Sequence, residues 1–161
     1  MSTSPGIWLR VSQSNKSLKK YQGKNPYNGQ PFVYGIGTDI IEVKRVKSAL
    51  EKYPGFKTRV YTKHEITFCE DKKNKTARYI SYAQRFAAKE AVAKALGTGM
   101  GKTIFFRDIE VLNMPSGQPI IKLSAKAQEM LIQKGLFDLT ISLSGIKDYA
   151  VAFVIVLARY T

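Results

Sequence analysis

The sequence predicts an α+β fold built from a long buried helix and antiparallel hairpins. Helical patterns dominate the first part of the chain, with one over residues 43–53 and a stronger one over residues 85–97. Strand-like runs joined by short turns dominate the second part, and the last of them spans residues 149–158. Helices followed by antiparallel hairpins favour the α+β class, and no internal repeat argues for a solenoid or propeller.

The first elements are a strand and two helices. The run "VYGIGTDII" predicts a short apolar strand broken by two glycines. The amphipathic helix that follows ends at Pro54 and Gly55, which stop a helix. A further short helix is predicted over "TKHEITFCE", where Thr62 is the expected N-cap and Glu65 completes a capping box.

The stretch "RFAAKEAVAKALGTG", residues 85–99, predicts the main helix of the fold. Apolar residues lie nearly all round it and Gly97 ends it, so we expect this helix to be buried. It nevertheless carries Lys89, Glu90 and Lys94, and charged residues are rarely buried unless they are paired or bound to something. These three charges therefore mark a candidate site.

The second half of the chain supplies the sheet. Residues 106–114 and 118–124 read as two strands joined by the turn "PSGQ". A helix follows, with Ser124 as its N-cap and Gly135 after its end. The chain closes with "LTISLS", which alternates cleanly, and "YAVAFVIVLA", which is too apolar to be half-exposed.

Composition narrows the class of protein. A chain of 161 residues fits one domain with a single core, and no apolar run is long enough to span a membrane. The lone Cys69 excludes an intrachain disulfide and fits a reducing compartment such as the cytoplasm. The chain also has a single histidine, His64, so its composition argues against a Cys/His metal site.

The charge balance is unusual, because 26 basic residues face 12 acidic ones and give a net charge of +14. Such an excess indicates an anionic partner: a nucleic acid, a membrane surface, a phosphorylated cofactor or an acidic protein. Residues 1–33 hold five of the basic residues and no acidic one, and they show no periodic apolar pattern. We expect residues 1–33 to form a flexible basic extension and residues 34–161 to form the domain.

Two carboxylates, Asp39 and Glu90, are candidate metal ligands. Asp39 stands three residues before Glu42, which is also the spacing of a helix N-cap with its capping box. The glycines of "GIGT" before Asp39 favour the ligand interpretation, because glycine lets a backbone approach a ligand closely. Glu90 has its own alternative as a surface partner of Lys94. Two carboxylates beside lysines fit Mg²⁺ with a phosphorylated substrate.

The stretch "GTGMGKT", residues 97–103, resembles a phosphate-binding loop only superficially. A nucleotide P-loop requires G-x-x-x-x-G-K-[ST] between a strand and a helix, whereas this stretch has another spacing and follows a helix. The sequence therefore excludes a P-loop nucleoside triphosphatase.

Several separated stretches together resemble holo-acyl-carrier-protein synthase, the small group of 4′-phosphopantetheinyl transferases. They are "GIGTDIIEVKRV", "RFAAKEAVAKALGTG", "FRDIEVLNMPSGQPIIKLS" and "SLSGIKDYAVAFVIV". The resemblance runs from about residue 34 to the end of the chain. It implies transfer of the phosphopantetheine arm of coenzyme A to a serine of apo-acyl carrier protein. It also implies release of adenosine 3′,5′-bisphosphate, use of Mg²⁺ and assembly into homotrimers.

The resemblance also implies roles for individual residues. Asp39 and Glu90 would be the magnesium ligands, and Lys94 would contact a coenzyme A phosphate. Arg85 and Lys89 would help to form the nucleotide end of the site. Arg45 would lie where the carrier protein docks. The coenzyme A cleft would be bordered by Gly97, Thr98 and Gly99.

The sequence departs from the family at one position and leaves two rival interpretations open. Members usually carry a histidine that contacts a coenzyme A phosphate where this chain has Gly145 in "SLSGIKDYA". An active enzyme with weakened coenzyme A binding, or a relative that has lost catalysis, would both fit. A basic nucleic-acid-binding module is the other alternative, but no helix-turn-helix, zinc-finger, RNP or KH signature supports it.

Overall fold

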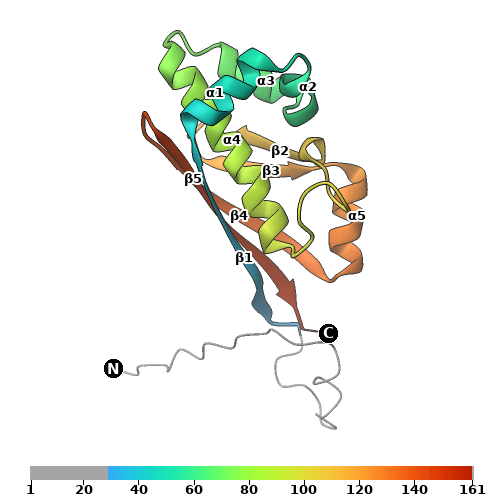
Figure 1. Ribbon diagram of the computed structural model, residues 1–161. Helices are drawn as coiled ribbons and strands as arrows, with labels where there is room; N and C mark the ends of the chain where they lie inside the picture. The colour runs from blue at the N-terminus through green and yellow to red at the C-terminus, as the bar shows by residue number, and fades with distance from the viewer. Residues whose placement is uncertain (1–28, 161) are drawn as a thin grey trace, which may run out of the picture.

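The computed structural model describes residues 29–160. The elements, in chain order, are β1 (Pro31–Glu42), α1 (Val43–Lys52), α2 (Phe56–Val60), α3 (Lys63–Glu70), α4 (Lys75–Ala95), the 3₁₀ turn η2 (Phe106–Asp108), β2 (Ile109–Asn113), β3 (Pro119–Leu123), α5 (Ala125–Gln133), β4 (Leu136–Gly145) and β5 (Tyr149–Arg159). Figure 1 shows α4 lying across one face of a long sheet, with the short helices α1, α2 and α3 gathered at one end.

The main sheet has the order β1-β5-β4, and both pairings are antiparallel. The first and last strands of the domain are therefore neighbours, and the sheet is complete only when the two ends of the domain have come together. A separate hairpin, β2-β3, packs beside α4. The predicted α+β class, with its long helix and antiparallel hairpins, is confirmed.

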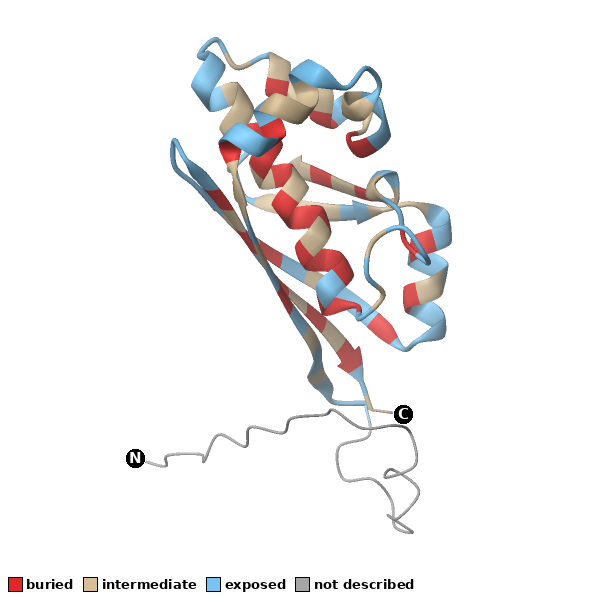
Figure 2. Ribbon diagram, in the orientation of Figure 1, coloured by how far each residue is buried: buried red, intermediate tan, exposed pale blue. Residues whose placement is uncertain are grey.

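The core lies where α4 meets the sheet. Burial follows α4 along most of its length, as the red segments of Figure 2 show. Six of its alanines are almost completely buried, namely Ala83, Ala87, Ala88, Ala91, Ala93 and Ala95. On the sheet side, Ala152, Val154 and Val156 of the central strand β5 are also fully buried. Small side chains on α4 let the helix lie close to the strands.

The helix ends agree in part with the sequence predictions. Thr62 and Glu65 form the predicted capping box of α3, and Ser124 caps α5 by accepting from the backbone N–H of Ala127. Helix α4 begins at Lys75, ten residues before the predicted start, with Asn74 as its N-cap. The helix extends further because its first turns cover the cluster formed by α1 and α3.

The N-cap interpretation of Asp39 is wrong. Strand β1 continues to Glu42, and Asp39 pairs with Ala152 within that strand. Glu42 itself occupies the N-cap position of α1 without making a side-chain capping bond. The three-residue spacing resembled a capping box, but pairing with β5 keeps this stretch extended.

The structured domain starts slightly before the predicted boundary at residue 34. Pro31, Phe32 and Val33 already pair with the end of β5, and the Phe32 ring lies 4.4 Å from that of Tyr160. Residues 1–28 of the predicted extension lie outside the described residues. Within residues 29–160, no helix is long and apolar enough to cross a membrane.

Candidate active site at the seam between β1 and α4

Two glycines bring α4 against β1. A Cβ atom at Gly37 would lie 1.9 Å from the carbonyl oxygen of Ala91, and one at Gly35 would lie 2.1 Å from that of Ala95. Both distances are too short for any residue with a Cβ atom. Glycine at positions 35 and 37 therefore allows α4 to lie this close to β1. The approach of α4 accounts for both glycines, and the approach of a ligand to this backbone stays a prediction. Because strand side chains alternate, Asp39 lies on the same face as Gly37 and faces α4.

Asp39 and Lys94 meet across this seam. The Lys94 Nζ atom lies 2.7 Å from Asp39 Oδ1 and also donates to the Thr38 carbonyl oxygen at 3.0 Å. The Asp39 side chain is only 15% exposed, whereas that of Lys94 is 52% exposed. The ammonium therefore reaches solvent while the carboxylate stays sheltered beside the helix.

Glu90 completes a cluster of three charges. It is half-buried one turn before Lys94 on α4. Burial raises the pKa of the Glu90 carboxyl, the nearby charge of Asp39 raises this pKa further, and Lys94 opposes both effects. A carboxylate that burial and a like charge both disfavour gains most from a bound cation.

The donor set at the seam fits a magnesium ion. Mg²⁺ is commonly bound by one or two carboxylates, with water and substrate phosphates completing its shell. Asp39 and Glu90 supply such a pair, and within residues 29–160 no group of three or more His, Cys, Asp or Glu side chains offers a fuller set of ligands. The cluster therefore suits a cation that a phosphorylated substrate helps to hold.

Arg85 lies two and a half turns from Lys94 and is almost fully buried. Its guanidinium donates to the Ser81 hydroxyl at 3.0 Å and to Asn113 Oδ1 at 2.8 Å, and it lies 4.1 Å from the centre of the Phe68 ring. Arg85, Phe68 and Asn113 line a groove of about 340 Å³, together with His64, Val111, Leu112 and Lys122. Arg85 thus borders a groove with a basic wall.

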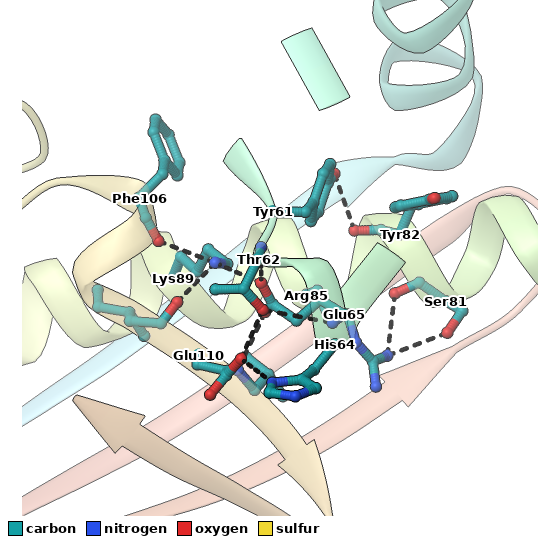
Figure 3. Close-up of polar contacts among 12 residues, drawn as sticks. Tyr61, Thr62, His64, Glu65, Ser81, Tyr82, Arg85, Lys89, Phe106 and Glu110 are labelled. Carbon is teal, nitrogen blue, oxygen red and sulfur yellow. Dashed lines mark hydrogen bonds and ion pairs between the residues drawn. The ribbon is translucent and has the colours of Figure 1, made fainter. Parts of the chain in front are cut away.

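Lys89 has a different environment from the one predicted. Its side chain is fully buried, and its Nζ atom donates to Glu65 Oε2 at 2.8 Å, to the Phe106 carbonyl oxygen at 2.8 Å and to that of Ile109 (Figure 3). Burial lowers the pKa of Lys89, and Glu65 opposes this effect. All three donors are used, so the expected contact between Lys89 and a nucleotide has no geometric support.

The loop after α4 closes the helix. Gly97 and Gly99 have φ angles of 68° and 63°, which favour glycine. The backbone N–H of Thr98 donates to the Ala93 carbonyl oxygen at 3.1 Å, as in a C-terminal helix cap. Gly97, Thr98 and Gly99 thus follow directly from the turn that carries Lys94.

Arg45 lies apart from the seam, exposed on α1. A second groove, of about 480 Å³, runs between α1, the start of α4 and the β4–β5 turn. Lysines from these three places line it, namely Lys44, Lys47, Lys75 and Lys147. The structure therefore places Lys147 at this groove and exposed to solvent.

Gly145 ends β4 against α4. A Cβ atom there would lie 2.7 Å from Ile80 Cγ2 and 3.0 Å from Gln84 Nε2. The side chains of Ile80 and Gln84 thus occupy the space that a residue larger than glycine would enter. Side chains of α4 therefore pack directly against the backbone of Gly145.

Sequence reasoning missed the contacts that Asn113, Phe68 and Glu65 make with α4. Asn113 is the last residue of β2 and accepts from Arg85 of α4, whereas Phe68 lies on α3. No local pattern pairs them with α4, because each contact joins segments far apart in the sequence. A buried arginine in an alanine-rich helix was the one signal that such partners must exist.

Comparison of the sequence and the fold with known proteins shows the class to which the chain belongs. The family model of the 4′-phosphopantetheinyl transferase superfamily matches residues 35–154. The chain belongs to this superfamily, and it is an enzyme of the holo-[acyl-carrier-protein] synthase family.

Individual relatives agree with this assignment. The holo-[acyl-carrier-protein] synthase of Ruminiclostridium cellulolyticum is 47% identical over 122 residues, which cover 75% of this chain and 90% of the relative. The crystal structure of the synthase from Bacillus anthracis, in complex with CoA (3′,5′-ADP), is 37% identical with a TM-score of 0.66 and covers 79% of this chain and 98% of that one. The Helicobacter pylori synthase in complex with coenzyme A is 34% identical with a TM-score of 0.65, over 75% and 98% of the two chains.

Proposed function

We propose that the protein transfers the 4′-phosphopantetheine group of coenzyme A to a serine of apo-acyl carrier protein. The products are holo-acyl carrier protein and adenosine 3′,5′-bisphosphate, and the reaction requires Mg²⁺. The observation that carries this proposal is the cluster of Asp39, Glu90 and Lys94 at the β1–α4 seam, in a chain of the synthase family.

In the transfer, the serine oxygen forms a bond to the phosphorus of the pantetheine phosphate. The bond from that phosphorus to the bridging oxygen of the pyrophosphate breaks, and the nucleotide leaves with the electron pair. The serine proton passes to a base, either a carboxylate of the cluster or a water beside it. When bound, Mg²⁺ neutralises charge on the pyrophosphate oxygens.

Different residues of the site would bind the metal and the parts of the substrate. Asp39 and Glu90 would hold the metal. Lys94, now paired with Asp39 and half-exposed, would turn its ammonium to a substrate phosphate. Arg85 would help to form the nucleotide end through the groove that it borders with Asn113. Gly97, Thr98 and Gly99 would border the cleft, because they leave α4 one turn after Lys94.

The carrier protein would dock on α1. Arg45 is exposed there, and carrier proteins of this kind are acidic, so a basic helix raises the encounter rate and helps to select the partner. The reaction would belong to fatty acid biosynthesis in the cytoplasm, where a lone reduced Cys69 is expected.

A homotrimer would cover the outer face of the sheet. Along β1, Ile36 and Ile40 point away from α4 and are 55% and 65% exposed, and Phe153 on the neighbouring β5 is 42% exposed. Such an apolar face on a sheet favours association with further copies. Light scattering should give three times the mass of one chain, and Ile40→Lys should lower it.

A transfer assay tests the function. Incubation with coenzyme A, Mg²⁺ and an apo-acyl carrier protein should add the mass of phosphopantetheine to the carrier serine. Asp39→Ala and Glu90→Ala should each abolish transfer while leaving the circular dichroism spectrum unchanged. Near-normal turnover of either variant at saturating coenzyme A would contradict the metal assignment, and no transfer by the parent would contradict the function.

A further inference from the structure

Two consecutive residues of α4 have opposite environments. Glu90 is half-buried beside Asp39, whereas Lys89 is fully buried and turned toward β2. Neighbouring residues on a helix differ by about 100° in direction. Whatever fixes the direction of Lys89 therefore fixes that of Glu90.

Lys89 is held by a buried carboxylate whose two oxygens both accept hydrogen bonds. Glu65 Oε2 accepts from Lys89 and, at 2.8 Å, from the backbone N–H of Thr62, while Oε1 accepts from the backbone N–H of Val111 at 3.0 Å. The side chains of Glu65 and Lys89 are fully buried. Figure 3 shows how this pair joins α3 and α4, with the start of β2 beside them.

Much of the buried face of α4 is made of small side chains that resist rotation only weakly. Ala87, Ala88, Ala91 and Ala93 are small and similar in shape, whereas larger buried side chains of the helix, such as Tyr82 and Val92, are fewer. A buried ion pair, in contrast, resists rotation strongly, because separating it leaves two unpaired charges away from water. The pair therefore specifies an orientation that the alanines leave open.

On the other side of the helix, contact with β1 sets the distance between the two elements. Among the described residues, the half-exposed Lys94 makes the only side-chain hydrogen bonds from this part of α4 to β1. Gly37 and Gly35 let the backbone of α4 contact that of β1 closely. This contact brings Glu90 near enough to Asp39 for the Asp39 charge to affect the pKa of Glu90. Glycines have no side chains that would hinder a shift or rotation of α4 along β1. Such a movement would take the Glu90 carboxylate away from Asp39.

We propose that Glu65 and Lys89 are positioning residues that hold α4 in the rotation at which Glu90 and Asp39 share one cation. The inference rests on the proposed function, because it supposes that these two carboxylates are the metal ligands. Neither Glu65 nor Lys89 touches substrate, and their effect passes through Glu90.

The test uses the neutral double variant Glu65→Gln/Lys89→Met in the full-length protein. It removes both buried charges at once, and the introduced glutamine keeps an acceptor for the backbone of α3 or β2. Mn²⁺ binding is measured by electron paramagnetic resonance in the presence of coenzyme A, beside the Mg²⁺ dependence of transfer. We expect Mn²⁺ to bind about tenfold more weakly, as when the support of a metal ligand is lost. The KM for the carrier protein should stay unchanged.

A matched control is Cys69→Ala. Cys69 also joins α3 to α4, through a contact of 3.4 Å with the Ser81 hydroxyl, but it lies away from Glu90. This variant should lose thermal stability and keep the parent's Mn²⁺ affinity. Equal loss of Mn²⁺ affinity in the control would show a general effect of loosening α4 and would overturn the specific role.

A second variant covers the case in which the double variant does not fold. Glu65→Asp keeps the charge but shortens the side chain, so Lys89 must shift toward α3 and α4 must turn slightly. It should also weaken Mn²⁺ binding. Parent-like affinity in every folded variant overturns this inference alone, whereas a parent that binds no Mn²⁺ overturns the metal site and this inference with it.

Discussion

Single residues at the seam are arranged for function at some cost in stability. Asp39 and Glu90 are brought together although both carry negative charge, and burial of Glu90 adds to the penalty. Lys94 offsets part of it, but a half-exposed ion pair contributes no more than about 1 kcal/mol. The cluster is therefore poised to accept a further positive charge.

Glu90→Gln should stabilise the metal-free protein at neutral pH. The pKa of Glu90 is raised in the folded state. Protonation of Glu90 therefore favours the folded parent, and the folded parent loses stability as the pH rises from the unfolded-state pKa of Glu90 to its folded-state pKa. The glutamine variant cannot ionise at this position and so does not lose that stability. In thermal melts in EDTA, Glu90→Gln should therefore have a higher Tm than the parent at pH 7 and a similar Tm at low pH.

The matched control for that experiment is Glu51→Gln on α1, where the glutamate is exposed beside Lys47. The Tm of this variant should not rise above the parent value at pH 7, because Glu51 is paired with Lys47 and accepts from the Tyr79 hydroxyl. A Tm of Glu90→Gln that stays below the parent value at pH 7 would mean that Glu90 makes a net stabilising interaction.

Arg45→Glu should raise the KM for carrier protein by about fivefold, which corresponds to about 1 kcal/mol for an exposed charge. The KM for coenzyme A should change little, and high salt should reduce the effect because the interaction is screened. Lys134→Glu after α5 provides a control with the same change in net charge. Initial rates over a range of both substrates measure the difference, and equal effects of the two variants would remove Arg45 from the docking face.

Gly145→His should improve coenzyme A binding only when space is made for it. The new side chain would meet Ile80 and Gln84, so the single variant must displace them. Gly145→His/Ile80→Ala/Gln84→Ala should therefore have a lower KM for coenzyme A than Gly145→His alone, with Ile80→Ala/Gln84→Ala as control. If the triple variant and this control share one KM, the imidazole supplies no contact to the substrate.

At the scale of elements, the meeting of β1 with α4 determines the geometry of the site. The strand contributes Asp39, the helix contributes Glu90 and Lys94, and two glycines let the backbones touch. The distance between the carboxylates thus depends on the separation of two elements as a whole. Small changes in that separation should matter more than changes at exposed residues nearby.

Gly37→Ala should push α4 away from β1. The added methyl would lie 1.9 Å from the Ala91 carbonyl oxygen, so backbone must move, and we expect a loss of about 3 kcal/mol in the free energy of unfolding. Transfer should fall further than stability explains, because Asp39 and Glu90 separate. Urea denaturation and transfer rates measure both, with Ser142→Ala on β4 as control. Unchanged stability would show that the helix is not in contact at Gly37.

The sequence predicted the elements better than the contacts between them. Thr62 and Glu65 were identified as a capping box from local spacing, and the structure confirms it. The same spacing misled at Asp39, because pairing with a strand more than a hundred residues away overrides a local helix signal. The tertiary partner of Glu65 was invisible for the same reason: Lys89 lies on another helix.

At the scale of the whole molecule, the two ends of the domain support each other. Phe32 near the start of β1 packs against Tyr160 after the end of β5, and Arg159 donates to the Gly29 carbonyl oxygen. The domain boundary predicted at residue 34 would cut through this contact. The difference of a few residues therefore has a measurable consequence.

A chain lacking residues 1–33 should be less stable than one lacking residues 1–28. The longer deletion removes Phe32 and the strand pairs of residues 31–33, and burial of one such aromatic side chain contributes about 2 kcal/mol. Both truncated proteins should be compared by urea denaturation. Identical midpoints would show that the start of β1 adds nothing to the domain.

The pairing of β1 with β5 also bears on the order in which the site forms during synthesis. Asp39 emerges from the ribosome early, together with the rest of β1, but its strand partner β5 is the last of the described elements to be made. Contacts of such long range in the sequence form slowly. Strand β1, and with it Asp39, therefore gains its place in the sheet only after residues 149–159 have been synthesised.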